Sequence, residues 1–232
     1  MANSHCNNRD GSLYSHKPSR MTIKILNLYA GIGGNRKLWD GDIEVTAIEN
    51  NKEIAKIYQD FFPNDKVIVC DAHQYLLEHF EEYDFIWSSP PCPTHSQMKV
   101  FMVKSQKGWN KDRKASYPDM KLYEEIILLK HFFKGKWVVE NVRSYYDPLI
   151  KPQEIQRHYI WSNFNVGNIK LKRGNIAKKH TNDVAEYYGV DNLDKYSLKT
   201  FRKDQAVRNC VHPKLGLHIF NMAFKEPQKT LT

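Results

Sequence analysis

The sequence of 232 residues has few cysteines, no long apolar run and fewer acidic than basic side chains. Its four cysteines are scattered and include no C-x-x-C pair, so neither a zinc site nor a disulfide framework is indicated. The most apolar stretches, such as 125–133, are far shorter than the ~20 residues that a bilayer requires, which excludes a membrane span. No apolar signal segment follows the start, so we expect a protein of the reducing cytoplasm.

The composition does favour a folded domain. Hydrophobic residues make up 41% of the chain and aromatic residues 12%, which argues against intrinsic disorder. The length suits one domain, with or without a small appendage. The 35 Lys and Arg against 26 Asp and Glu give a net charge of +9, which favours an anionic partner, with nucleic acid as the leading candidate.

Short β-rich runs alternate with amphipathic stretches from residue 22 onward. Residues 1–20 are polar and without periodicity, which suits a leader or added segment outside the fold, although a native arm with contacts of its own is the alternative. The predicted strands are 23–28, 44–48, 66–70, 83–88, 136–140 and 157–161. The predicted helices are 34–40, 52–62, 73–80, 119–133 and 213–224. This alternation predicts an α/β fold with a mostly parallel, twisted sheet and helices on both faces.

Glycines and acids follow the first three predicted strands. The first strand runs into Tyr29-Ala30-Gly31-Ile32-Gly33-Gly34, where glycine lets the backbone approach a ligand, although Arg36 breaks the full dinucleotide pattern. Glu49 can accept a hydrogen bond from a ribose hydroxyl, and Asp71 one from an adenine amine. A tight turn alone would explain the glycines, but the three features together favour an adenosine-containing cofactor. The predicted cofactor set is Tyr29, Ala30, Gly31, Ile32, Gly33, Gly34, Glu49, Asn50, Asp71, Ala72, Pro90 and Asn209.

Two chemically distinctive residues follow the next two strands. Prolines at 90, 91 and 93 make a stiff loop around Cys92, whose thiol would need an electropositive setting or a proton acceptor to ionise. Glu140 comes directly after two valines, a costly place for an acid without a partner or a task. A structural cysteine and a salt-bridged glutamate are the alternatives. We expect a catalytic pair at adjacent strand ends.

The segment 29–34, Pro90-Pro91-Cys92 and Glu140-Asn141-Val142, in this order, resemble the motifs of the DNA cytosine-5 methyltransferase family. The resemblance covers about 23–164 and resumes at 208–215, which is similar to the family's last motif, one that packs against the cofactor loop. Asp119, Leu122 and Glu125 fit the helix that the family places before the glutamate. The resemblance implies a Rossmann-like fold that binds S-adenosylmethionine.

The resemblance also implies a mechanism. The Cys92 thiolate would attack carbon 6 of a flipped-out cytosine, so that carbon 5 can accept the methyl group before the proton at carbon 5 and the cysteine leave. Glu140 would contact N3 and the exocyclic amine, and Asn141 would hold the loop. Tyr29 and the glycines of the segment 29–34, the glycine loop, would hold the methionine moiety. Glu49 would hold the ribose and Asp71 the adenine.

The sequence departs from the family at two places. Pro93 follows the cysteine where the family usually has glutamine. The family's Gln-x-Arg-x-Arg motif is matched by 153–157, with Ile155 in place of the first arginine. Arg157 then falls on the arginine that the family uses to grip the cytosine O2.

Two basic segments are candidates for binding nucleic acid. Residues 97–114 carry six cations and one acid, a local charge of +5 that suits phosphate contacts, although a solvated loop is the alternative. Residues 165–204 occupy the place of the family's target-recognition region and are much shorter, so we expect a short target. The predicted contacts are Ser96, Lys99, Lys104, Arg113, Lys172, Arg173, Lys178 and Lys179.

The sequence therefore predicts a compact enzyme that forms 5-methylcytosine in double-stranded DNA, monomeric and without a metal. We expect a leader (1–20), a catalytic domain (21–164), a basic recognition region (165–204) and a segment that returns to the catalytic domain (205–232). The economy of length suits a phage or an orphan bacterial modification gene. The same chemistry on tRNA, an amino-methyltransferase and a non-catalytic nucleic-acid-binding relative are the alternatives.

Overall fold

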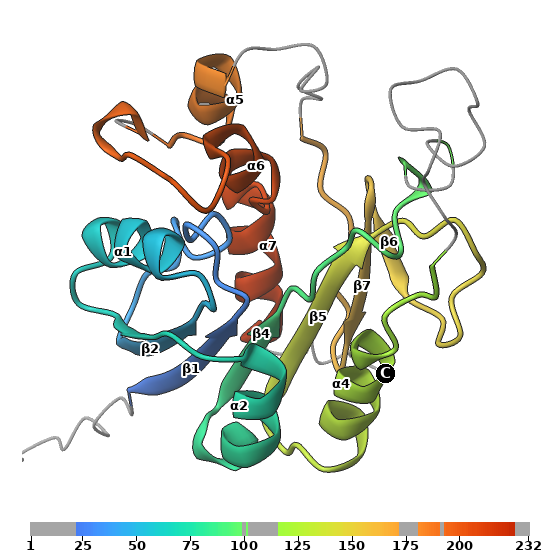
Figure 1. Cartoon of the computed structure of the whole chain (residues 1–232). Coiled ribbons are helices and arrows are strands. Elements are labelled where there is room, and N and C mark those ends of the chain that lie inside the picture. The colour runs from blue at the N-terminus through green and yellow to red at the C-terminus, as the bar shows by residue number, and fades with distance from the viewer. Residues whose placement is uncertain (1–21, 99–100, 102–115, 172–180, 191–192, 226–232) are drawn as a thin grey trace, which may run out of the picture.

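A seven-stranded sheet in the order β3-β2-β1-β4-β5-β7-β6 forms the centre of the computed structural model (Figure 1). The structure describes residues 22–98, 101, 116–171, 181–190 and 193–225. The predicted residues Lys99, Lys104, Arg113, Lys172, Arg173, Lys178 and Lys179 lie outside these ranges, as do most of the 97–114 segment and residues 1–20.

The first five strands in this order are parallel, and β7 runs antiparallel to both of its neighbours, β5 and β6. The strands are β1 (Ile23–Leu28), β2 (Ile43–Ile48), β3 (Lys66–Ile68), β4 (Phe85–Ser88), β5 (Lys136–Val142), β6 (Gln153–Ile155) and β7 (His158–Ser162). The predicted strands are confirmed with shifts at their ends, and β6 is an addition. All four residues of β4 are buried, as expected of a strand covered on both faces.

Helices cover the two faces of the sheet. Leu26 and Leu28 of β1 pack in one cluster with α2 (Ala72–His79) and α4 (Lys121–His131). Ile25, on the opposite face of β1, packs in another cluster with α7 (Pro213–Ala223). The alternation of side chains along each strand thus gives each helix layer its own core.

The remaining helices are α1 (Lys52–Phe61), α5 (Thr181–Tyr187), α6 (Lys203–Arg208) and the short η1 (Phe80–Glu82) and η3 (Leu193–Lys195). Phe80 of η1 packs against the cluster of α2 and α4, and the other four helices contribute to a third cluster. Ile54 and Ile57 of α1 form a buried cluster with Val184, Tyr188 and Val207. The polar segment 165–204, in which no helix was predicted, therefore contributes apolar side chains to the core.

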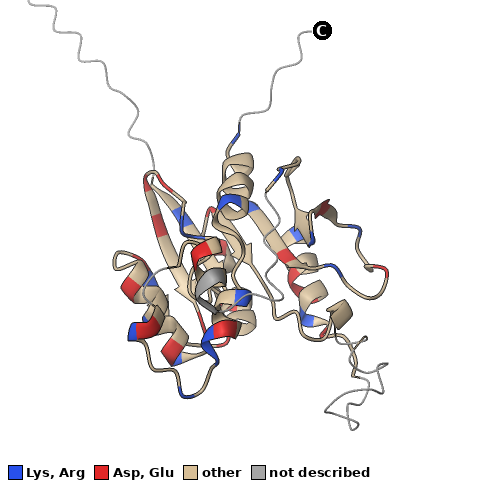
Figure 2. Ribbon diagram, turned by 90° about the horizontal axis from the view of Figure 1, so that it is seen from above, with Lys and Arg blue, Asp and Glu red and all other residues tan. Residues whose placement is uncertain are grey.

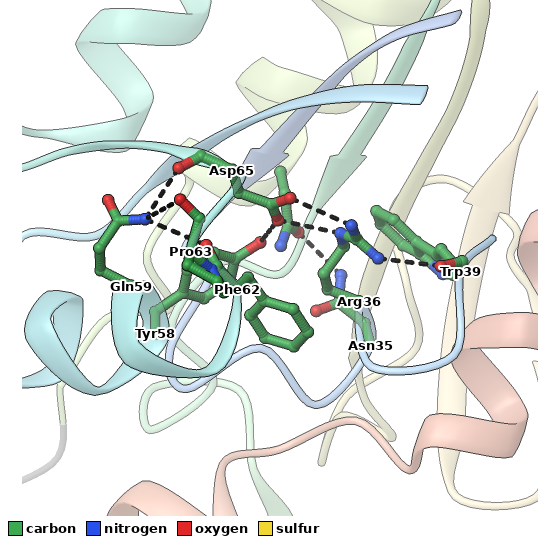
Figure 3. Close-up of polar contacts among 9 residues, drawn as sticks. Asn35, Arg36, Trp39, Tyr58, Gln59, Phe62, Pro63 and Asp65 are labelled. Carbon is green, nitrogen blue, oxygen red and sulfur yellow. Dashed lines mark hydrogen bonds and ion pairs between the residues drawn. The ribbon is translucent and has the colours of Figure 1, made fainter. Parts of the chain in front are cut away.

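The predicted helix at 34–40 is wrong, because this segment forms a series of turns. Side chains satisfy its polar groups in place of a helical ladder (Figure 3). The Arg36 guanidinium donates to the Trp39 carbonyl oxygen at 3.0 Å and to both carboxylate oxygens of Asp65 at 2.9 and 3.0 Å. The Asn35 amide donates to Asn27 Oδ1 at 2.8 Å.

Asp65 also binds α1, since Tyr58 Oη donates to its carboxylate at 2.8 Å. Gln59 Nε2 adds bonds to the carbonyl oxygens of Phe62 and Asp65 at 3.0 and 2.9 Å. The turns after the glycine loop are thus tied to the end of α1 (Figure 3). This polar cluster is structural support beneath the predicted cofactor loop.

Acidic and basic positions are interspersed over the described ribbon (Figure 2). No described helix has the length and apolar composition needed to cross a membrane. The described side chains also form no cluster of three or more His, Cys, Asp or Glu suited to a metal ion.

Candidate active site

The predicted site residues follow strands whose carboxyl ends meet at one edge of the sheet. The parallel strands β2, β1, β4 and β5 lie side by side in this order. Their paired stretches end at the same level of the sheet, at Ile48, Leu28, Ser88 and Val139. In open α/β sheets, ligands bind outside this edge. The glycine loop, Glu49, the Cys92 loop and the end of β5 are therefore close to one another by topology.

The glycine loop and Glu49 hold each other. The Glu49 carboxylate accepts from the backbone N–H groups of Gly31 at 3.0 Å and Asn51 at 2.9 Å. Burial raises the pKa of Glu49, while the backbone hydrogen bonds from Asn51, Gly31 and Asn50 oppose that shift. The carboxylate is thus fixed at the end of β2 by main-chain donors.

Gly31 lies at φ +54°, and a Cβ added there would meet nothing within 4 Å. The space in front of the loop is therefore open, and a side chain at this position would project into it. Tyr29, two residues earlier, also has a positive φ of 53°. A left-handed backbone is uncommon outside glycine, so this turn is held by its surroundings.

The buried carboxylate of Glu125 holds this turn in place. Glu125 of α4 is 1% exposed and accepts from Tyr29 Oη and Ser88 Oγ, both at 2.6 Å. His73 Nδ1 lies 3.0 Å from Glu125 Oε1, and this contact raises the pKa of His73 despite the opposing effect of burial. Glu125 thereby joins the ends of β1 and β4 to the start of α2. The sequence offered no signal for His73 beyond its place beside Asp71.

The other predicted cofactor residues are spread along the same edge. Asp71 is exposed and caps α2 by accepting from Gln74 N at 2.9 Å, and Ala72 is buried. Asn209 is exposed and follows α6. Their roles stay predictions.

The segment 208–215 packs against the glycine loop. A Cβ added at Gly34 would lie 2.6 Å from the Val211 carbonyl oxygen and 2.7 Å from Cys210 Cβ. Only glycine allows this approach. The segment 208–215 therefore packs closely against the backbone of the glycine loop at Gly34.

The Cys92 loop is a tight turn. The Cys92 carbonyl oxygen accepts from the backbone N–H groups of His95 and Ser96, both at 3.0 Å. Asn141 Nδ2 donates to the Pro90 carbonyl oxygen at 3.0 Å, so the end of β5 holds the proline segment. Ser96 forms an isolated antiparallel bridge with Ser144. The cysteine is partly buried on a loop tied to two other segments.

Glu140 lies beside this loop and is 6% exposed. Its Oε2 accepts from Ser89 Oγ at 3.0 Å, and its Oε1 lies 2.5 Å from His158 Nδ1. Burial raises the pKa of the Cys92 thiol, and the negative charge of Glu140 raises it further. The predicted pair is thus electrostatically coupled.

Arg157 and His158 stand where β6 turns into β7. Arg157 is exposed, and its carbonyl oxygen accepts from Arg143 N at 3.1 Å. His158 begins β7 and contacts Glu140, a role that sequence reasoning missed. The antiparallel register opposite β5, which brings this imidazole to the carboxylate, could not be read from the sequence. The role of Arg157 stays a prediction.

Comparisons with known proteins identify the family of this chain. The family model described as C-5 cytosine-specific DNA methylase matches residues 23–149, more than half of the chain. No curated protein sequence matches it. Among solved structures, a DNMT2 variant from Spodoptera frugiperda is 24% identical over 52% of this chain and 35% of its own, with a TM-score of 0.35. A SAM-dependent methyltransferase from Agrobacterium tumefaciens is 13% identical over 55% of this chain and 41% of its own, with a TM-score of 0.36.

The fold is a Rossmann-like α/β fold with a mostly parallel sheet, as predicted. The chain belongs to the C-5 cytosine-specific DNA methylase family. S-adenosylmethionine is the cofactor that this membership assigns, in agreement with the sequence prediction. The chain spans 35% of the length of the DNMT2 variant that it matches.

The residues present fit this cofactor. Open space lies in front of Gly31, and a fixed carboxylate borders the loop at the end of the next strand. Both oxygens of Glu49 keep lone pairs after accepting from the main chain. Glu49 can therefore receive ribose hydroxyls without giving up its position.

Proposed function

We propose that this chain transfers a methyl group from S-adenosylmethionine to carbon 5 of a flipped-out cytosine in double-stranded DNA, through a covalent adduct of Cys92. The observation that carries the proposal is the buried Glu140 carboxylate, which accepts a hydrogen bond from Ser89 at the start of the loop that bears Cys92. A buried acid beside a cysteine on a stiff loop is costly to keep without a task.

The chemistry follows from the two side chains. The Cys92 thiolate adds to carbon 6, forming the C6–Sγ bond and sending electrons through C4 to N3. Carbon 5 thereby becomes nucleophilic, and the bound cofactor supplies an electrophilic methyl group. The Glu140 side chain meets N3 and the exocyclic amine, where charge changes during addition. Loss of the carbon-5 proton and of Cys92 then releases the product.

The surrounding residues hold these groups in place. Asn141 fixes the Pro90 carbonyl oxygen, and Ser89 fixes one oxygen of Glu140. The glycine loop, Glu49 and Asp71 receive the cofactor, and Arg157 is our candidate for the cytosine O2. Preorganised contacts of this kind lower the barrier because they need no rearrangement during the reaction.

DNA is the proposed substrate because of the family and the basic segments. The net charge of +9 and the +5 of residues 97–114 suit phosphate contacts on duplex DNA. A recognition region as short as 165–204 favours a short target sequence and a monomer acting alone. Methylation mapping that showed six or more fixed bases would contradict this part.

The test uses the whole chain with duplex DNA that carries 5-fluorocytosine. Because fluorine cannot leave carbon 5 as a proton does, the adduct should persist in a denaturing gel when S-adenosylmethionine is present. Labelled S-adenosylmethionine with equal amounts of duplex DNA and tRNA then decides the substrate. Label in tRNA alone would move the proposal to RNA, and no adduct with no label in either would overturn it.

A further inference from the structure

His158 makes a short contact with the predicted catalytic acid. Its Nδ1 lies 2.5 Å from Glu140 Oε1, and the side chain is only 25% exposed. The Glu140 side chain is 8% exposed. Such a short contact, largely out of water, is that of a charge-assisted hydrogen bond. Ser89 holds the other oxygen of the same carboxylate.

Charged and titratable groups face His158 from each neighbouring element. Burial lowers the pKa of His158, but the charge and hydrogen bond of Glu140 on β5 raise it overall, against the opposing charge of Arg157. Across the site, burial is the main cause that raises the pKa values of Cys92, after β4, and of Tyr188, after α5. The negative charge of Glu140 raises both further. Glu140 therefore acts on all three groups, and His158 is the basic side chain in direct contact with it.

The negative charge of Glu140 opposes the ionisation of Cys92, and a charged His158 can reduce this opposition. Cys92 has to lose a proton beside an ionised carboxylate, and two negative charges close together oppose each other. An imidazolium on the far side of Glu140 reduces that opposition. It also keeps the carboxylate in one orientation, because both of its oxygens then accept from fixed donors.

We propose that His158 is a positioning residue for the Cys92–Glu140 pair: as an imidazolium it holds the Glu140 carboxylate through Nδ1–H and offsets its charge while the Cys92 thiol ionises. Its part in methylation rests on the proposed function. The Cys92 thiol first gives its proton to water, since this residue is only partly buried. As the C6–Sγ bond forms, N3 of the cytosine takes up one proton from the His158 imidazolium through the Glu140 carboxylate, leaving neutral His158 and ionised Glu140. When Cys92 leaves, the proton returns from N3 through Glu140 to His158.

Alkylation of Cys92 tests the charge effect without DNA. The rate with iodoacetamide, measured at residue 92 by peptide mass spectrometry from pH 6 to 9, reports the thiolate fraction. His158→Asn keeps an N–H donor near the Nδ1 position but carries no charge. At pH 6 we expect wild-type Cys92 to react about fivefold faster than in His158→Asn, with the difference fading as pH rises past the raised pKa of His158.

Two further variants separate charge from structure. His158→Arg supplies a permanent cation, so its advantage over His158→Asn should persist to pH 9. His131→Asn changes an exposed histidine of α4 and should leave the whole profile as in the wild type. Identical profiles for wild type and His158→Asn would overturn the proposal.

Nuclear magnetic resonance of the His158 ring gives a second readout. The ring should titrate above the ordinary value near 6.5 in the wild type and below it in Glu140→Gln, where burial remains and the charge is gone. A wild-type ring that titrates below the ordinary value would also overturn the proposal.

The rate of adduct formation tests whether His158 acts in the reaction itself. His158→Asn should lower the rate of adduct formation with 5-fluorocytosine DNA about 30-fold and leave KM for DNA within about threefold. It should also lose the fall in rate that the wild type shows on the alkaline side, as pH rises past the raised pKa of His158. A wild type that forms no adduct while the alkylation profiles differ would count against the proposed function alone. An adduct formed equally fast by wild type and variant, with the same pH profile, would count against the role of His158 alone.

Discussion

The two halves of the site hold their carboxylates in different ways. In the cofactor half, Glu49 is fixed by backbone N–H groups of Gly31 and Asn51. In the catalytic half, Glu140 is fixed by the side chains of Ser89 and His158. Main-chain donors do not titrate, whereas an imidazole gains and loses a proton near neutral pH.

The difference matches the two tasks. A binding site needs a constant acceptor, which glycine turns and main-chain donors provide at any pH. A site that adds a thiolate to a base needs charge that can change during the reaction. We therefore expect substitutions in the catalytic half to alter rates and pH profiles, and substitutions in the cofactor half to alter cofactor affinity.

The largest effect should come from Cys92→Ser. A serine hydroxyl ionises far less readily than a thiol, so adduct formation and methyl transfer should fall at least ~1000-fold. Radiolabel transfer to duplex DNA measures this. Cys70→Ser, at a partly buried cysteine after β3, is the matched control and should keep wild-type activity. Full activity of the Cys92 variant would disprove a thiolate mechanism.

Glu140→Gln should have the next largest effect. The amide keeps the shape but loses the charge and one acceptor, so turnover should fall about 100-fold with little change in cofactor affinity. Glu154→Gln, on β6, removes an exposed partner of Arg143 and should change neither. Unchanged turnover would return Glu140 to a structural role.

Glu49→Gln tests the other half. The amide has a single acceptor oxygen, so it cannot receive two backbone donors and a ribose together. Calorimetry should show the Kd for S-adenosylmethionine raised about tenfold, with DNA affinity unchanged. Glu44→Gln, on the exposed part of the same strand, is the control. A loss of turnover with unchanged cofactor affinity would contradict the assignment of Glu49 to cofactor binding.

The smallest effect concerns the contact that links the halves, from Tyr29 to Glu125. Tyr29→Phe removes the donor at 2.6 Å and should lower the free energy of unfolding by about 1 kcal/mol in urea denaturation. Tyr117→Phe, at a residue that is 93% exposed, should change it by almost nothing. Equal stability of both variants would show that the loop is held without Glu125.

Much of the fold was predictable because hydrophobic periodicity reports burial directly. The local pattern of apolar residues predicted the strands and four of the five expected helices. It also predicted that the sequence motifs follow the carboxyl ends of parallel strands. The helix at 34–40 failed because Asp65 and the Asn27 side chain, distant in sequence, satisfy that segment. The packing of Val184 and Tyr188 against α1 was hidden in a polar, weakly periodic stretch.

The sequence by itself determined the class of fold, the family and the residues that carry reactive groups, since these depend on residue type and short-range order. Only the tertiary structure decided which partners those groups meet. His158 reaches Glu140 through the register of an antiparallel pair, and Glu125 reaches Tyr29, Ser88 and His73 from another helix. Such contacts join residues far apart in the chain, and their energy comes from burial and geometry that no local pattern encodes.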